Sequence, residues 1–304
     1  MGSYFWGAAA ASHADQPVVK ASPLSPTKTG SVTNTNSTIH GLWVWKGPAI
    51  LAAPEGAARL LDFCRAEGIN EVYISALDHG KFSDPAAVGQ LIVLLHRSGI
   101  RAEALLSSED ADEPGKHRDT LLEHVRTVVK FDQSHPRARF DGIHLDIEPQ
   151  QRAENKGTGN LRFLPGLVEA YRAVRSVAEP AGLTTNADIQ NKLLKGSLSE
   201  RRTLLQSLPR LTLMLYELGG GGSAEQQANS LRAGSRKFLE MTYSGLQDPG
   251  LATLVVGLRT PDYGELLPGM LKVVEDSNAT DPHYAGWARH SYNDTLSAAA
   301  ASAY

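Results

Sequence analysis

The stretch Phe140-Asp141-Gly142-Ile143-His144-Leu145-Asp146-Ile147-Glu148-Pro149 has the alternating pattern of a buried β-strand, and the rest of the chain is interpreted around it. Successive side chains of a strand point to opposite faces, so this strand has one apolar face and one polar face. The apolar face carries Ile143, Leu145 and Ile147, and the polar face carries His144, Asp146 and Glu148. Because burying an imidazole and two carboxylates without partners is costly, the polar face must line a polar, functional space.

Strands and helices alternate on both sides of this stretch. Strands are predicted over residues 41–45, 70–76, 100–107, 142–148, 183–189, 210–217, 251–259 and 283–292. Helical periodicity predicts helices over residues 54–67, 84–99, 119–131, 161–178, 197–208, 224–243 and 263–275. Eight short βα units predict one α/β domain, a (β/α)₈ TIM barrel. A doubly wound nucleotide-binding sheet is the main alternative, but no strand is followed by a G-x-G-x-x-G motif or a P-loop.

Composition limits the classes of function. The chain has 304 residues, with 30 Lys and Arg against 33 Asp and Glu, and the formal net charge of −3 does not suggest a nucleic-acid partner. Cys64 is the only cysteine, which excludes an intrachain disulfide and a Cys₄ or Cys₂His₂ zinc site. No apolar run approaches the ~20 residues of a membrane span. We expect no metal and no cofactor, and the oligomeric state stays open.

The first 40 residues differ in composition from the rest. An apolar run at residues 4–11 resembles the remnant of a secretory signal without its basic region, and residues 15–40 are rich in Pro, Ser, Thr and Asn. We therefore expect a disordered tail over residues 1–40 and a single catalytic barrel over residues 41–304. A secreted or periplasmic location follows from the same pattern.

Inward side chains at the carboxyl ends of barrel strands are the candidate site residues. The expected set combines aromatic, amide and charged groups, which suits a carbohydrate because sugar rings stack on aromatics and hydroxyls pair with amides and carboxylates. Besides the catalytic candidates, the set predicted to bind substrate is Trp45, Tyr73, His144, Asn186, Asp188, Glu217, Arg259, Trp287 and His290.

Asp146 and Glu148 are the candidate catalytic pair. Two residues apart on one strand face, their Cα atoms are ~6.6 Å from each other. This proximity, together with partial burial, raises the pKa of one carboxyl group and leaves the other as an anion. Glycoside hydrolysis needs such a pair, and Glu148, nearer the strand end, is the better proton donor.

The strand-four stretch resembles the D-G-x-D-x-D-x-E motif of glycoside hydrolase family 18, the chitinase-like barrels. Asp141, Asp146 and Glu148 match its first Asp, third Asp and Glu, whereas His144 replaces the second Asp. Residues 214–217, Met-Leu-Tyr-Glu, resemble the strand-six M-x-Y-D of the family, and Trp287 falls where the family has a strand-eight tryptophan.

The resemblance implies a retaining, substrate-assisted mechanism. Glu148 would protonate the glycosidic oxygen, and the 2-acetamido oxygen of the substrate would attack the anomeric carbon. Asp146 would orient the acetamide and, as the stabilising carboxylate, stabilise the charge of the oxazolinium ion. Tyr216 would donate a hydrogen bond to the acetamide carbonyl, and Trp287 would form the floor of the sugar subsite. In the family the second Asp holds the third and shares its proton. His144 can still bond Asp146, but as an imidazolium it would lower the pKa of that carboxyl.

Five alternatives remain. Glu148-Pro149 is also typical of barrel glycosidases whose acid lies in Asn-Glu-Pro, although Ile147 precedes the Glu here. Asp146 and Glu148 could instead form structural ion pairs with Arg259 or Arg289. Two other classes of function are a metal-dependent hydrolase, with His144, Asp146 and Glu148 as ligands, and a non-catalytic glycan-binding barrel. His144 itself could be a core histidine satisfied by a hydrogen bond to Asp146.

Overall fold

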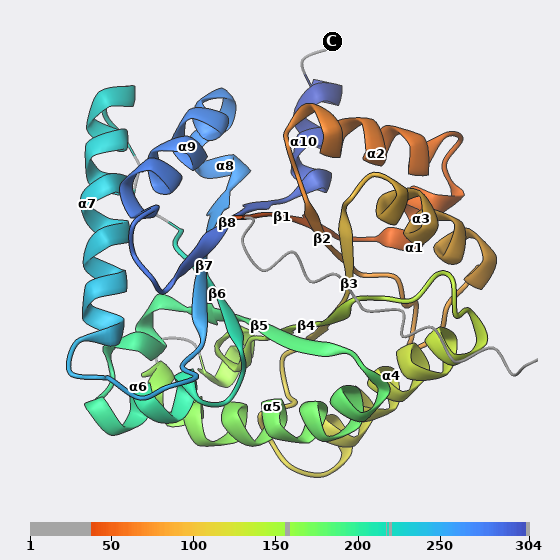
Figure 1. The fold of residues 1–304 in the computed structure, drawn as a ribbon, viewed down its shortest axis with the longest axis horizontal. Helices are drawn as coiled ribbons and strands as arrows, with labels where there is room; N and C mark the ends of the chain where they lie inside the picture. Colours follow the sequence, from red (N-terminus) through yellow and green to blue (C-terminus); the bar gives the residue numbers. More distant parts are fainter. Residues whose placement is uncertain (1–37, 156–158, 217, 219–220, 302–304) are drawn as a thin grey trace, which may run out of the picture. The chain divides into compact units, whose positions relative to one another are not determined.

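The structure, a computed structural model, describes residues 38–155, 159–216, 218 and 221–301 (Figure 1). Over these residues the strands form a closed barrel in chain order, every strand parallel to its neighbours, with β8 paired to β1. The strands are β1 Ile39–Val44, β2 Glu71–Ile74, β3 Arg101–Ser108, β4 Gly142–Ile147, β5 Thr184–Gln190, β6 Arg210–Met214, β7 Thr253–Arg259 and β8 Tyr284–His290. The predicted (β/α)₈ TIM barrel is confirmed.

The helices form an outer ring around the strands (Figure 1). They are α1 Gly47–Ala52, α2 Gly56–Ala66, α3 Pro85–Arg97, α4 Lys116–Ser134, α5 Leu164–Ala178, α6 Leu198–Leu205, α7 Ala224–Tyr243, α8 Thr260–Tyr263, α9 Leu267–Asn278 and α10 Tyr292–Ala301. Local sequence sets their starts: the Asp84 side chain accepts from Ala87 N at the start of α3, and capping boxes begin α6 and α7. Helices α1, α8 and α10 were not expected from the sequence.

The hydrophobic core lies between the strands and the helix ring. Ile143, Leu145 and Ile147 of β4 are at most 4% exposed and belong to this outer core, and α5 lies against β4 and β5. Burying each such side chain contributes about 1.5–3 kcal/mol. A much smaller apolar cluster, which includes Trp43 and Tyr73, fills part of the barrel interior. The rest of the interior is polar, so the polar face of β4 does look into the barrel.

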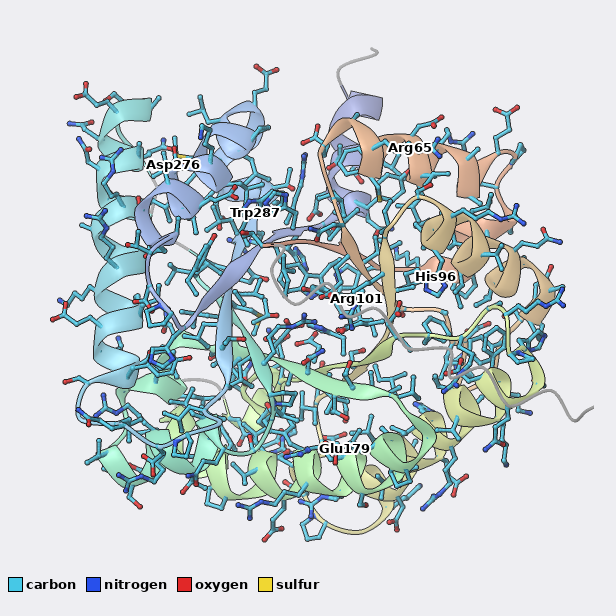
Figure 2. The ribbon with its side chains drawn as sticks, viewed as in Figure 1. Arg65, His96, Arg101, Glu179, Asp276 and Trp287 are labelled. Carbon is cyan, nitrogen blue, oxygen red and sulfur yellow. The ribbon has the colours of Figure 1, made fainter. Side chains whose placement is uncertain are left out.

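Asp141, which matches the first Asp of the motif, has a structural role. Its carboxylate accepts a hydrogen bond from Ala102 N at 2.8 Å and lies 2.9 Å from Nε2 of His96, which Figure 2 marks on α3. These contacts fasten the start of β4 to β3 and to α3. Asp141 therefore fixes where Asp146 and Glu148 lie without touching the cavity at the other end of the strand.

The expected tail over residues 1–40 lies almost entirely outside the described residues. The barrel begins with Ile39 of β1, two residues before the predicted boundary. In the described part of the chain, no helix has both the length and the hydropathy needed to cross a membrane.

Candidate active site

A polar cavity of about 420 Å³ lies at the carboxyl ends of the strands. Its wall is mainly aromatic and polar: indole, phenol and imidazole rings, carboxylates, side-chain amides and cations, with one thioether. The lining residues are Trp43, Trp45, Asp146, Glu148, Gln151, Asp188, Gln190, Asn191, Lys192, Met214, Tyr216, Arg259 and His290. This is the part of a TIM barrel in which enzymes of this fold bind their substrates.

Glu148 directly follows β4 and is only partly buried. Its backbone N–H donates to Ser108 O at 2.9 Å, which ties the end of β4 to the end of β3. Pro149 then starts a short 3₁₀ turn, and Gln150 Nε2 donates to the Glu148 carboxylate at 2.8 Å. Burial raises the pKa of Glu148, and the charge of Asp188 adds to this, against hydrogen bonds from three glutamines that lower it. A partly exposed carboxyl group with a raised pKa can donate a proton to a substrate.

Asp146 lies deeper and is 8% exposed. Its Oδ1 atom is buried and has no hydrogen-bond partner among the described residues. Burial raises its pKa well above the usual range, and the charges of Asp188 and Glu148 raise it further, while His144 lowers it. Burial and the neighbouring carboxylates therefore favour the protonated form of Asp146, whose side chain lines the cavity.

His144 lies beneath the cavity and is wholly buried. Its Nε2 is 2.8 Å from Asp188 Oδ1, its Nδ1 is 3.2 Å from Glu103 Oε2, and the ring stacks on Tyr73 at 3.7 Å. Burial alone would lower the pKa of His144, but Asp188 and Glu103 raise it to about 9. The expected hydrogen bond to Asp146 is not formed. His144 is a satisfied interior imidazolium whose partner at the cavity is Asp188.

Below His144, the barrel interior holds a network of buried ion pairs. Arg210 of β6 bonds both Glu71 of β2 and Glu103 of β3, and Asn186 of β5 donates to Glu103 at 2.7 Å. Burial opposes ionisation of Glu103, but Arg210 and His144 together lower its pKa to about 2. Asn186 and Tyr73, both expected to bind substrate, are part of this interior and do not line the cavity.

Aromatic groups from β1, β6 and β8 complete the cavity wall. Trp43 Nε1 donates to Asp188 Oδ2 at 2.9 Å, and Trp45 Nε1 donates to His290 Nε2 at 3.0 Å. Burial lowers the pKa of His290, so its Nε2 can accept this bond at neutral pH. The Arg259 guanidinium lies over the Tyr216 ring at 5.2 Å.

Trp287 is the clearest departure from the expected site. It lies on the outer face of β8, stacks on His40 at 4.3 Å and donates to Glu275 of α9 at 3.2 Å (Figure 2). The prediction placed both Trp287 and His290 inward, but residues three apart on a strand point to opposite faces, and the structure turns His290 inward. Trp287 therefore does not form a floor for the cavity.

The structure brings together most of the other expected residues. Trp45, Asp146, Glu148, Asp188, Tyr216, Arg259 and His290 line the cavity. Glu217 lies outside the described residues. Sequence reasoning did not find Gln151, Gln190, Asn191, Lys192 and Met214. Gln190 continues the inward series of Asn186 and Asp188 on β5, so extending the alternation by one step would have found it.

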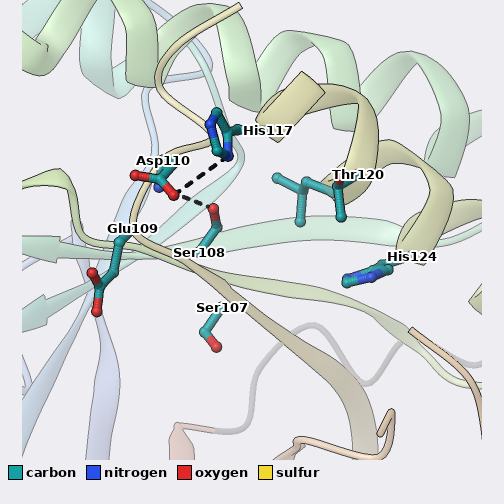
Figure 3. A pocket seen from close by; sticks show the side chains of 8 residues that line it. Ser107, Ser108, Glu109, Asp110, His117, Thr120 and His124 are labelled. Atoms are coloured by element: carbon teal, nitrogen blue, oxygen red, sulfur yellow. Dashed lines mark hydrogen bonds and ion pairs between the residues drawn. The ribbon is translucent and has the colours of Figure 1, made fainter. Parts of the chain in front are cut away.

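A second cleft of about 320 Å³ lies between the end of β3 and α4 (Figure 3). Ser107, Ser108, Glu109 and Asp110 line one side, and His117, Thr120, Leu121 and His124 line the other. Ser107 is in register with Asp146, and Ser108 holds the backbone of Glu148, so the cleft borders the catalytic candidates.

The described residues contain no group of three or more His, Cys, Asp or Glu side chains arranged to hold a metal. The three residues considered as metal ligands, His144, Asp146 and Glu148, do not point to one common position. His144 is enclosed between Glu103 and Asp188 below the cavity. Arg289 is bound to Glu67 on the outer side of the barrel, so it is not the ion-pair partner considered for Asp146.

Similarity to known proteins appears only at the level of three-dimensional structure, since no family model and no curated protein matches the chain. The glycoside hydrolase domain of PgaB (BpsB) from Bordetella bronchiseptica is similar over 88% of this chain and 98% of that chain, with a TM-score of 0.51 at 13% identity. A putative chitinase A from Streptomyces coelicolor is similar over 87% of this chain and 95% of that chain, with a TM-score of 0.51 at 12% identity. The chain thus has the barrel fold of chitinase-like glycoside hydrolases, as the strand-four motif implied.

Proposed function

We propose that the protein is a glycoside hydrolase that acts on a polysaccharide or oligosaccharide containing 2-acetamido sugars. The observation that carries the proposal is the pair of carboxyl groups at the end of β4, both with a raised pKa and both facing one cavity. Glu148, the more exposed, donates its proton to the glycosidic oxygen. Asp146, which lines the same cavity, holds the acetamido group beside the anomeric carbon.

In the proposed reaction the acetamido oxygen attacks the anomeric carbon as the leaving group takes the proton of Glu148. The resulting oxazolinium ion is opened by water, whose proton returns to Glu148, so the configuration at the anomeric carbon is retained. Tyr216 lies at the same cavity and donates its hydroxyl hydrogen to the acetamide carbonyl. Trp45 supplies a ring surface against which a sugar can stack.

Replacement of Glu148 by Gln tests the assignment. The amide keeps the size of the side chain but cannot donate a proton as an acid, so we expect hydrolysis to fall by at least ~10²-fold, within the range of general acid catalysis. The measurement is product formation from a panel of chitin-type and other oligosaccharides, with analysis of product size and anomeric configuration. Glu109→Gln, an exposed carboxylate on the neighbouring loop, is the matched control and should keep wild-type turnover. Unchanged turnover in Glu148→Gln would refute the proposal.

A second candidate is a glycan-binding barrel without catalysis. His144, in the place of the second motif Asp, is the observation that favours it, because the carboxylate that shares a proton with the third Asp is missing from β4. Binding of oligosaccharides by the wild-type protein with no release of products would support this candidate. Secretion or transfer to the periplasm also stays a proposal, which fractionation of cells that express the full chain would test.

A further inference from the structure

Asp188 of β5 is the most firmly held carboxylate at the cavity. Trp43 Nε1 donates to its Oδ2 at 2.9 Å, and His144 Nε2 bonds its Oδ1 at 2.8 Å. The residue is 2% exposed, yet it lines the cavity beside Asp146. A buried carboxylate that takes one hydrogen bond from an indole and one from an imidazolium is stabilised as an anion.

Asp188 and Asp146 lie side by side on neighbouring strands. β4 and β5 are paired at His144 with Asn186 and at Leu145 with Ala187. The next step along both strands brings Asp146 level with Asp188, and adjacent strands are about 4.8 Å apart. Two carboxyl groups that project from the same level of neighbouring strands do not both ionise readily. Asp188 has two donors for its charge, whereas Oδ1 of Asp146 has no partner among the described residues.

The charges of the barrel interior lead to the same assignment. Three carboxylates, Glu71, Glu103 and Asp188, face three cations. The cations are Arg101 and Arg210, which contact Glu71 and Glu103, and His144, which joins Glu103 to Asp188. An ionised Asp146 would add a buried negative charge beside the Asp188 carboxylate, which is costly.

We propose that Asp188 is a positioning residue for Asp146, held by Trp43 and by the His144 imidazolium, and that it supplies from β5 the carboxylate that β4 lacks at residue 144. Asp188 keeps the proton on Asp146, so Asp146 can donate to the substrate. His144 acts through Asp188 and does not contact the reacting atoms. Only the step in which Asp146 donates to a substrate rests on the proposed function; the effect of Asp188 on the proton of Asp146 does not.

Substitutions of Asp188 and of His144 should shift the pKa of Asp146 in opposite directions. Asp188→Asn removes a neighbouring negative charge, so the pKa of Asp146 should fall. His144→Gln removes a positive charge but keeps an amide donor for Asp188, so the pKa of Asp146 should rise. One nearby charge shifts a pKa by roughly one unit or more. A purely structural role for Asp188 and His144 would not produce shifts of opposite sign.

The experiment follows the carboxyl ¹³C signal of Asp146 against pH in protein labelled at its aspartate carboxyl carbons, with Asp146→Asn used to assign the signal. We expect the midpoint to move down in Asp188→Asn and up in His144→Gln. Asp78→Asn, which changes an exposed carboxylate, should leave it unchanged. Shifts in the same direction, or no shift, would overturn the proposal. Circular dichroism and melting curves establish that each variant is folded.

A measurement on the wild-type protein covers the case in which a variant does not fold. The ¹⁵N signals of His144 should report an imidazolium at pH 7 that loses its proton only near pH 9. A neutral His144 at pH 7 would overturn the proposal without any substitution. Neither the Asp146 titration nor the His144 titration needs a substrate. Their outcome is therefore independent of whether the protein hydrolyses glycans or only binds them. In an active enzyme, Asp188→Asn should also move the alkaline limb of kcat/KM to lower pH.

Discussion

His144 occupies the position where the family motif has a carboxylate, and its surroundings explain how the barrel accepts the exchange. The imidazole is enclosed by Glu103 below and Asp188 above, and the Tyr73 ring covers one face. His144 was expected to bind substrate, with a core histidine bonded to Asp146 as the alternative; the structure instead buries it between Glu103 and Asp188. The register between β4 and β5 determines that Asp188 receives the hydrogen bond from His144. The alternation of side chains within one strand carries no information about that register.

The titration of His144 predicts how stability depends on pH. Its pKa is about 9 in the folded protein against 6.5 for an unperturbed histidine, so the native state binds its proton more tightly than the unfolded chain does. The stabilisation is complete below about pH 6.5 and is lost as pH rises through 9, an effect on the order of 3 kcal/mol. Melting temperatures between about pH 6 and pH 9.5 should therefore fall more steeply in the wild type than in His144→Gln. His79→Gln, which alters an exposed histidine, should follow the wild-type curve.

β8 shows how far element prediction reaches. Apolar alternation and the spacing of βα units located all eight strands, because these patterns are local. The pairing of β7 with β8 shifts register between Leu254 and Val255. Leu254 pairs with Tyr284 but Val255 pairs with Gly286, so one residue of β8 is skipped. Such an irregularity depends on two strands at once and has no signal in either alone. The predicted end of the strand also ran two residues too far, since Tyr292 begins α10.

Gly286 closes the barrel at this irregular site. Its φ is +144°, and a Cβ atom there would lie 2.0 Å from the backbone oxygen of Ile39 on β1. Gly286→Ala should therefore destabilise the protein by roughly 2–4 kcal/mol, because both the backbone and the β1–β8 contact must shift. The measurement is the midpoint of chemical denaturation. Gly269→Ala, on an exposed position of α9 with nothing within 4 Å, should have no destabilising effect and can stabilise by up to about 1 kcal/mol. Equal midpoints for the two variants would contradict this role of Gly286.

At the scale of the whole molecule, the site is built from strands that are far apart in the sequence. The cavity joins Trp43 of β1, Glu148 after β4, Asp188 of β5 and His290 of β8, and the ion network beneath it joins β2, β3, β4 and β6. The sequence predicts which residues stand at strand ends, because a parallel barrel puts all those ends at one rim. It does not predict which side chains meet across the interior, since those contacts depend on the packing of layers from all the strands.

Substitution of Arg210 measures how much the buried ion network contributes to the stability of the protein. Arg210 bonds Glu71 and Glu103 inside the barrel, so Arg210→Met leaves two buried carboxylates without their main cation and should cost roughly 3–5 kcal/mol at pH 7. In the variant the folded-state pKa values of both carboxyls would exceed their unfolded values, so stability should recover as pH falls from about 7 to about 5.

Denaturation curves at pH 7 and pH 5 test this role of Arg210. Combining Arg210→Met with Glu71→Gln and Glu103→Gln removes the unpaired charges and should restore part of the loss at pH 7. Arg65→Met, at an exposed pair with Asp62, should change stability by less than about 1 kcal/mol at either pH. If Arg210→Met were as stable as Arg65→Met at pH 7, the ion network would not be what holds the base of the barrel.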